Sequence, residues 1–404
     1  MSLLLSLMVV LLHLARSQDV CGSKQRAPEQ RVYRIAVLNV RGSARDEFEM
    51  LFQAYLSESA GKAFEPPIRF EMFPISFDEA LSRDISYDFI HANPAIYSCL
   101  DIETGAVKSL ATIVKKQIIN NVTYELSESA GTIIVRKSSS IERLVDVRDK
   151  RVAAGSVVGF GSGNMQYREF QSEGLQTNDV SKWIFTGDQN RVIQGLLKEE
   201  WDVGFIRADQ IDHYVDPATG ERLDVADQVK HIHVRNTSFP YTVSTPLYPE
   251  WNVAALSKVP EAVIREVQNA LLKQSALADT WEAYETCVSD KNTTECEPFA
   301  TAVNPLAGCD VSKKLSQLAS EARVRAELAF WKTSASYADV RSMQETTGFL
   351  RKYDGQWKCI RGNDIHGAIT CPPGFEQRTE EEIQCDSCPE GLVCVCKPCR
   401  EIPT

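Results

Sequence analysis

The sequence has no excess of positive charge. Its 404 residues include 44 Lys and Arg against 55 Asp and Glu, which gives a net charge of −11. The field of the whole chain therefore repels nucleic acid and anionic lipid, and we expect no nucleic-acid partner. With 43% apolar and 25% charged residues, the composition also excludes a disordered chain and a collagen-like repeat.

Long apolar runs are missing beyond residue 20, which excludes a multi-span membrane protein. The apolar residues 3–14 are too few to span a bilayer, because a spanning helix needs roughly 20. Their number, followed by the small residues Ala15 and Ser17, predicts a signal peptide over residues 1–17, with an uncleaved anchor as the alternative. Sequons at Asn121, Asn236 and Asn292 agree with export. We expect a location outside the cell, either secreted or at the extracellular face of the plasma membrane.

Familiar catalytic patterns are absent as well. The chain contains no His-Glu-x-x-His, no nucleophile elbow and no Ser-His-Asp order. His231 and His233 share one face of a strand but have no third ligand nearby in sequence, so an exposed strand is the better interpretation. We therefore expect no metal, no cofactor and no enzyme activity. If the protein were an enzyme, Asp188 and Asp209 would be its acid and base.

Cysteine is plentiful but unevenly spread. None of the twelve precedes Cys21, and seven fall between Cys359 and Cys399. Two Cys-x-x-Cys spacings in the tail would suit a zinc ribbon, but in an exported chain disulfides are favoured. We expect disulfides at Cys21, Cys99, Cys287, Cys296, Cys309, Cys359, Cys371, Cys385, Cys388, Cys394, Cys396 and Cys399. By elimination Cys21 pairs with Cys99. Because seven is odd, one tail cysteine bonds outside the tail, with Cys287, Cys296 or Cys309 as candidates, unless the last module is incomplete.

The apolar pattern predicts an α/β protein with strands and helices alternating over residues 31–350. The rhythm restarts near residue 131, so we expect two lobes in succession. Periodicity lapses over residues 279–310, which we interpret as a disulfide-tied surface insertion. Residues 355–404 are rich in Cys, Pro, Gly and Glu, so we expect a small disulfide-rich module that depends on cross-links rather than on a core.

A glycine-rich turn over residues 155–164 lies between a predicted strand and a predicted helix. Such a turn exposes backbone N–H groups, and the following helix directs its positive end toward them. The arrangement suits a small anion such as a carboxylate, sulfonate or phosphonate. It is no P-loop, because no Lys-Ser/Thr pair follows, and it lacks the acidic residue of a dinucleotide site. A plain structural turn is the alternative.

Several segments carry a family resemblance. They are residues 35–38 followed by Arg41 and Gly42, then 87–90 with 93–97, 110–112, the glycine turn ending in 165–169, 185–187, 202–207 and 247–251. Their order resembles the phosphonate/phosphite-type periplasmic substrate-binding proteins of ABC importers. It is closer still to the version that serves as the extracellular sensor of histidine kinases. Residues 355–404 are similar to cysteine-rich repeats of eukaryotic receptor ectodomains.

The resemblance implies a two-lobed periplasmic-binding-protein (Venus-flytrap, type II) fold with a hinge. Lobe 1 would comprise residues 31–135 and 241–350, and lobe 2 residues 136–240. Ligand-binding residues carried over by motif position are Arg41, Tyr97, Gly161, Ser162, Gly163, Asn164, Gln189, Arg207 and Asp209. Tyr97 has packing as its alternative role, Arg41 and Arg207 have surface ion pairs, and Asp209 would otherwise orient Arg207.

The chain departs from the transport members of that family. The glycine turn offers one hydroxyl, Ser162, where those members have a run of Ser and Thr. Gln189 replaces a frequent His, and the neighbouring Asp188 would oppose a dianion. We therefore expect a small anionic or polar solute, with a phosphonate in doubt and a monoanion or amino-acid-like molecule open.

These features predict a non-catalytic binding protein. It would be the ligand-sensing part of a receptor whose membrane tether or signalling module is absent from this chain, or a secreted solute-binding protein. An enzyme grown on the same fold and an interaction protein that has lost its ligand are the alternatives.

Overall fold

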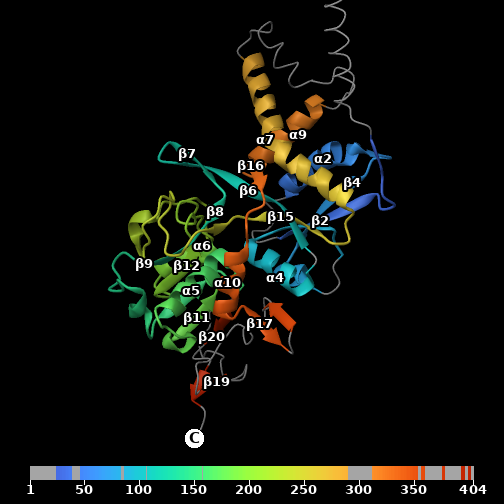
Figure 1. Cartoon of the computed structure of the whole chain (residues 1–404). Helices are drawn as coiled ribbons and strands as arrows, with labels where there is room; N and C mark the ends of the chain where they lie inside the picture. Colours follow the sequence, from blue (N-terminus) through green and yellow to red (C-terminus); the bar gives the residue numbers. More distant parts are fainter. Residues whose placement is uncertain are drawn as a thin grey trace, which may run out of the picture.

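The computed structural model describes residues 24–38, 46–82, 86–105, 107–156, 158–289, 312–353, 356–359, 375–377, 393–395 and 399–401. Several predictions lie outside these residues: the signal peptide, Arg41, Asn292, Cys21, Cys296, Cys309 and the side chains of the tail cysteines other than Cys359. Two α/β lobes lie side by side, joined by extended strands (Figure 1).

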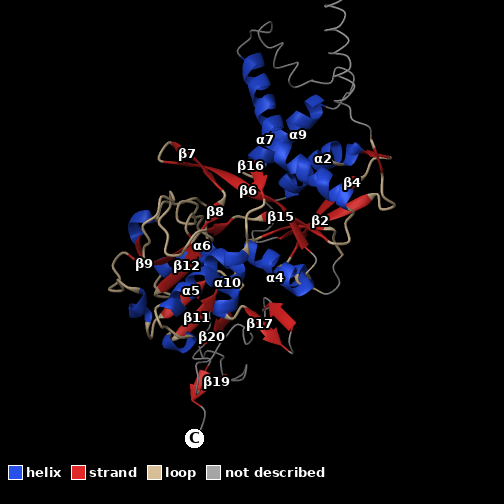
Figure 2. Ribbon diagram, viewed as in Figure 1, coloured by secondary structure: helices blue, strands red, loops and turns tan. Residues whose placement is uncertain are grey.

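The sheet of lobe 1 follows the strand order β16-β6-β15-β5-β2-β4. β2 pairs in parallel with β4 and β5, whereas β15 runs antiparallel to β5 and β6. Both faces are covered by helices (Figure 2), so the strands are apolar on both sides. The strands are β2 (Val32–Leu38), β4 (Arg69–Ile75), β5 (Phe89–Ala92), β6 (Val107–Ile119), β15 (Asn252–Leu256) and β16 (Leu328–Thr333).

Two separate cores flank this sheet. On one face α2 (Asp46–Ser59), α7 (Glu261–Ser289) and α9 (Ser312–Arg325) pack around Phe52 and Trp331. On the other face lie α3 (Phe77–Ala80) and α4 (Pro94–Thr104). α7 continues to Ser289, so residues 279–289 of the predicted insertion are helical, and Trp281 on that part of the helix is buried. Residues 290–310 of the predicted insertion lie outside the described residues.

The sheet of lobe 2 follows the order β13-β9-β12-β10-β11-β20. Phe170 of α5 packs on one face, and Ile193 and Leu196 of α6 on the other. The elements are β9 (Gly131–Arg136), β10 (Arg151–Ala154), α5 (Met165–Ser172), β11 (Lys182–Phe185), α6 (Gln189–Leu197), β12 (Val203–Arg207), β13 (Val229–Ile232) and β20 (Val393–Val395).

The strand order confirms the predicted type II fold. In each lobe the first parallel strand lies between the second and the third. An antiparallel strand that has just crossed from the other lobe follows, β15 in lobe 1 and β9 in lobe 2. The crossing chains meet where β8 (Glu128–Ser129) pairs with β14 (Tyr248–Pro249), so we take this pair as the hinge.

The predicted lobe boundaries need small corrections. β9 belongs to lobe 2 from Gly131 onward, because its apolar residues pair with β12 and are buried on both faces. The outward crossing therefore lies near residue 129 and not at 135. The return lies at β14, since Tyr241 and Val243 still pack beside Ala130 and Ala208.

The tail was expected to stand apart, but parts of it join the lobes. β17 (Leu350–Tyr353) and β18 (Gln356–Cys359) form a hairpin, and a disulfide links Cys359 to Cys99 of α4. The predicted Cys21–Cys99 pair is therefore wrong: the β17–β18 hairpin packs on α4 and brings Cys359 to Cys99. The expectation that one tail cysteine bonds outside the tail is confirmed, although its partner is none of the three candidates.

Further along the tail, β20 adds an antiparallel edge strand to β11, and Val395 is buried in the lobe 2 core. β19 (Phe375–Gln377) pairs with β21 (Cys399–Glu401). Cys287, near the end of α7, is also disulfide-bonded. Within the described ranges, no helix combines the length and the apolar character needed to cross a membrane.

Candidate binding site

The carboxyl ends of the lobe 2 strands bring several predicted residues together. Arg207 ends β12, and its backbone N–H donates to Oε1 of Gln189 at the start of α6, at 2.7 Å. The glycine turn that follows β10 lies against the same arginine. A Cβ atom added to Gly161 would lie 2.6 Å from Cγ of Arg207. Glycine is therefore required at 161 for the arginine side chain to pass over the turn.

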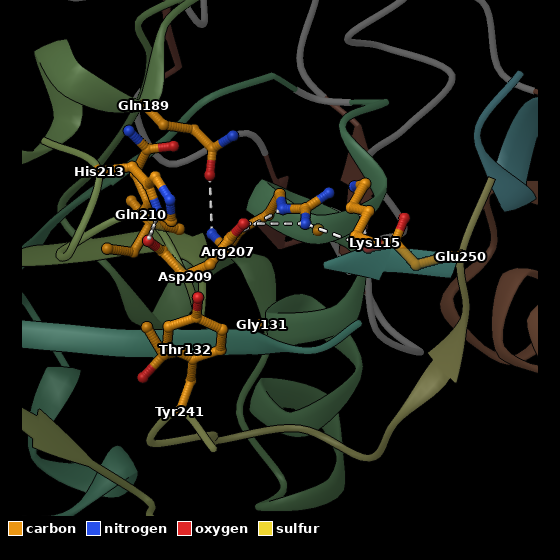
Figure 3. A network of polar contacts seen from close by, with 12 residues as sticks. Lys115, Gly131, Thr132, Gln189, Arg207, Asp209, Gln210, His213, Tyr241 and Glu250 are labelled. Atoms are coloured by element: carbon orange, nitrogen blue, oxygen red, sulfur yellow. Dashed lines mark hydrogen bonds and ion pairs between the residues drawn. The ribbon is translucent and has the colours of Figure 1, made fainter. Parts of the chain in front are cut away.

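Arg207 is held by carboxylates from two directions (Figure 3). Asp209 accepts hydrogen bonds from Nε and Nη2 of the arginine at 2.9 and 3.1 Å. Nη2 also donates to Oε1 of Glu250 at 3.2 Å, and Nζ of Lys115 donates to that same oxygen at 3.0 Å. Asp209 thus orients Arg207, as the alternative interpretation stated.

Lys115 and Glu250 were missed by sequence reasoning. Lys115 lies on β6, which leads from lobe 1 toward the hinge, and Glu250 lies directly after β14 on the return. Glu250 belongs to the 247–251 motif, one of the segments that carry the family resemblance. Its place in that motif could have identified it as a candidate site residue. Lys115 follows the 110–112 motif but has no local signal of its own.

The ion network shifts the pKa of each member. Burial alone would raise the pKa of Asp209, but the positive charge of Arg207 outweighs it and holds that pKa well below its usual range. The pKa of Glu250 is also lowered, because Lys115 and Arg207 outweigh its burial. Burial lowers the pKa of Lys115, aided by Arg207 and opposed by Glu250. The two carboxylates are therefore ionised at neutral pH.

A small polar pocket lies beside this network. Its empty space measures about 280 Å³ when the open solvent at its mouth is included, and the enclosed part has room for about one water molecule. Tyr241 closes one side, and burial raises the pKa of its phenol. The pocket therefore offers two half-buried cations, the buried carboxylate of Glu250, the half-buried carboxylate of Asp209 and a phenol. The formal charges of these groups sum to zero. It is lined by Lys115, Gln117, Leu126, Glu128, Ser129, Ala130, Arg207, Ala208, Asp209, Phe239, Tyr241 and Glu250.

The glycine turn is closely packed and largely buried. Residues Phe160–Asn164 form one wide helical turn before α5, and Gly163 is among its buried residues. Ser162 and Asn164 are 7% and 1% exposed. The Ser162 hydroxyl occupies the space that Cβ atoms on Gly155 and Gly159 would need, at 2.6 and 2.8 Å. The Ser162 hydroxyl therefore points toward Gly155 and Gly159 within the glycine turn.

Gln166, which sequence reasoning also missed, ties this turn to the sheet. Its side-chain Nε2 lies 2.6, 2.9 and 3.3 Å from the carbonyl oxygens of Ile206, Gly161 and Thr132. A Cβ atom on Gly131 would lie 2.3 Å from this nitrogen, so glycine makes room for it. The turn, β12 and the crossing strand β9 therefore form one unit behind Arg207.

Tyr97 is not brought to the charged pocket. Its ring lies 4.8 Å from that of Tyr337, centroid to centroid, and the contact is edge-on. Tyr337 is fixed there because its hydroxyl donates to the carbonyl of Glu250 at 2.9 Å and lies 3.0 Å from Oγ1 of Thr112. Tyr97 therefore packs beside Tyr337, outside the pocket at Arg207, and is partly exposed; its contact with a ligand stays a prediction.

The structure also shows the surroundings of the acid and base candidates and of two predicted glycosylation sites. Asp188 caps α6, where it accepts from Asn190 N at 3.0 Å, and it is exposed, whereas Asp209 is half-buried beside Arg207. Asn121, in the turn between β6 and β7 (Val122–Leu126), and Asn236 are both exposed. Among the described residues, no group of three metal-ligating side chains is assembled.

The chain is similar in sequence to a curated bacterial protein. Salmonella typhimurium has a tetrathionate sensor histidine kinase, TtrS, that is 24% identical over 252 residues, or 61% of this chain. The match covers 40% of that kinase, so this chain spans well under half of its relative.

Solved structures were compared as well. PhnD1 from Prochlorococcus marinus, in complex with methylphosphonate, is 12% identical with a TM-score of 0.49, covering 78% of this chain and 98% of its own. The periplasmic aliphatic sulphonate-binding protein SsuA from Escherichia coli is 13% identical with a TM-score of 0.41, covering 87% and 96%.

A protein family matches residues 52–286, which is more than half of the chain. That span begins in α2 of lobe 1, contains the lobe 2 elements from β9 to β13 together with Arg207, Asp209 and Glu250, and ends within α7. The chain therefore belongs to the family described as the phosphonate periplasmic substrate-binding proteins of ABC transporters.

Proposed function

We propose that this protein binds a small polar solute with one anionic group between its lobes, without chemical change, as the sensing part of a receptor outside the cytoplasm. The observation that carries the proposal is the link between Arg207 of lobe 2 and Glu250 at the hinge, beside Lys115 of β6. Cations from both sides of the hinge thus face one pocket. A solute that contacts both favours the closed arrangement of the lobes.

The charges that line the pocket determine which net charge of the solute is favoured. Arg207 and Lys115 are matched by Asp209 and Glu250, so an incoming anion meets no surplus of positive charge. A doubly charged anion would be repelled at close range by the carboxylates of Asp209 and Glu250, which are shielded from solvent in part and in full. A singly charged or zwitterionic solute, which replaces Glu250 as one partner of Arg207, fits this balance better.

The same network argues against catalysis. Asp209 is held ionised by Arg207, so it is a poor proton donor at neutral pH. Asp188, its only suggested partner, is an exposed helix cap that bonds its own helix. These two carboxylates therefore do not form an acid and base pair around a substrate.

The receptor role is supported by the relative that is named a sensor histidine kinase. A sensor needs binding to be converted into a movement that the rest of a receptor can detect. The tail strands that attach to both lobes provide a connection through which lobe movement would be transmitted. A secreted solute-binding protein would use the same pocket without that connection.

Ligand-dependent melting tests the proposal. The wild-type protein is heated with methanesulfonate, taurine, glycine, methylphosphonate and inorganic phosphate at pH 8, where the last two are largely dianions. A bound ligand at about 100 times its Kd adds roughly 2.7 kcal/mol, which raises the Tm by several degrees. We expect a rise with a singly charged or zwitterionic member and a smaller one with the dianions. No rise with any member would overturn the proposal.

A further inference from the structure

α10 (Ala338–Thr347) lies between the two lobes, next to α4 of lobe 1 and α5 of lobe 2 (Figure 1). Val340 and Met343 of this helix are buried in a small apolar cluster that is separate from the cores of the two lobes. The cluster also contains Ala95 from lobe 1, and Phe160 and Met165 from the glycine turn and α5 of lobe 2. A single short helix thus fills the space between the first turns of two helices that belong to different lobes.

The amino end of α10 is attached to lobe 1 and the hinge by hydrogen bonds. Tyr337 bonds Thr112 and the carbonyl of Glu250, and the backbone N–H of Ala335 donates to Oγ1 of Thr112 at 2.9 Å. Oγ of Ser334 donates to Oγ of Ser109 at 2.5 Å. The ring of Tyr337 lies edge-on beside that of Tyr97, the residue predicted to meet a ligand from lobe 1.

The carboxyl end contacts both lobes as well. Nε2 of Gln344 donates to the carbonyl of Ala95 at 3.2 Å, on α4. Phe349, just beyond the helix, packs edge-on against Tyr167 of α5, with ring centroids 6.0 Å apart. The chain then enters the β17–β18 hairpin, which the Cys99–Cys359 disulfide fastens to α4.

We propose that residues 334–349 form a strap that holds the lobes together in the absence of solute and leaves Phe160, Met165 and Tyr167 of lobe 2 when the lobes separate. The strap stays with lobe 1, because the Tyr337 hydrogen bonds and the disulfide attach it there, and lobe 2 is the side that it releases. The proposal rests on the proposed function only in assuming that the lobes move about the hinge.

The test compares ligand-free proteins. In Val340→Ala/Met343→Ala, the apolar contact with lobe 2 is reduced, whereas Ser342→Ala changes the exposed face of the same helix and serves as the control. Small-angle scattering measures the radius of gyration, and amide hydrogen exchange measures the opening of residues 159–165. We expect a larger radius and exchange about tenfold faster at those amides in the double variant, and neither change in the control.

Circular dichroism shows whether the double variant is folded. If it is not, Tyr337→Phe replaces it, because this change removes two hydrogen bonds and keeps the ring; the same two increases are expected at smaller size. If a folded variant has the same radius of gyration and the same amide exchange at residues 159–165 as the wild type, the strap proposal is wrong. These measurements contain no solute, so they remain valid even if no solute of the melting panel binds. If a solute does bind but the strap variants show no change in radius or exchange, the strap proposal alone is wrong.

Discussion

Nη2 of Arg207 lies 3.2 Å from Oε1 of Glu250, although the two residues are 43 positions apart and lie on opposite sides of a lobe crossing. Arg207 ends a strand of lobe 2, and Glu250 begins the return to lobe 1. Glu250 is 2% exposed, so this ion pair is shielded from solvent on the carboxylate side. Any movement of the lobes about the hinge changes its geometry.

Glu250→Gln tests the contribution of this pair to stability. The amide keeps a hydrogen-bond acceptor but removes the charge that Arg207 and Lys115 share, so we expect a loss of about 2 kcal/mol at pH 7. Because the pKa of Glu250 is lowered in the folded protein, its contribution is present above the ordinary carboxylate pKa of about 4.3 and is lost as the pH falls through the folded-state value.

Urea unfolding between pH 3 and pH 7 measures both effects. The variant should lose less stability on acidification than the wild type. Glu128→Gln is the matched control, since Glu128 is an exposed carboxylate on the rim of the same pocket; it should change stability by less than about 0.5 kcal/mol. Equal acid dependence in the wild type and Glu250→Gln would contradict the account.

Gly161→Ala tests the close approach of the glycine turn to Arg207. The added Cβ would lie 2.6 Å from Cγ of Arg207, so the arginine must shift. We expect a cost of about 1–3 kcal/mol in the wild-type background. In an Arg207→Ala background the clashing atom is absent, and the same substitution should cost little. A thermal-unfolding double-mutant cycle measures the difference, and equal costs in both backgrounds would refute the contact.

Removal of the Cys99–Cys359 disulfide should destabilise the protein. The bond joins positions 260 residues apart, and loss of such a cross-link costs about 2–5 kcal/mol. Cys99→Ala, Cys359→Ala and the double variant should melt at similar temperatures, because each lacks the same bond. A double variant as stable as the wild type under non-reducing conditions would show that the bond is not formed.

Glycan attachment can be predicted from exposure. Asn121 lies in the turn between β6 and β7, and Asn236 lies in an exposed segment after β13. When the chain is expressed in a eukaryotic secretory host, we expect mass spectrometry after glycosidase treatment to show deamidation at both positions. Unmodified asparagine at both would argue against the predicted export route.

Local patterns were enough to predict the alternating strands and helices, the glycine turn and the meeting of Arg207 with Asp209. These features depend on residues close in sequence, or on the rule that parallel strands end at one edge of a sheet. Lys115 and Glu250 were missed because they meet across 135 positions, on strands that cross between lobes. The edge-on contact of Tyr337 with Tyr97 depends on the position of a short, mostly polar helix that has no distinctive sequence pattern.

The central claim is that Arg207 holds an anionic solute between the lobes. The most direct measurement is calorimetric titration of the wild-type protein and Arg207→Ala with the panel member that raises the Tm most, after circular dichroism has shown both to be folded. We predict saturable binding to the wild type and binding at least about thirtyfold weaker to the variant, as expected when one partner of a buried charge contact is removed. Equal affinity in the two proteins would contradict the claim.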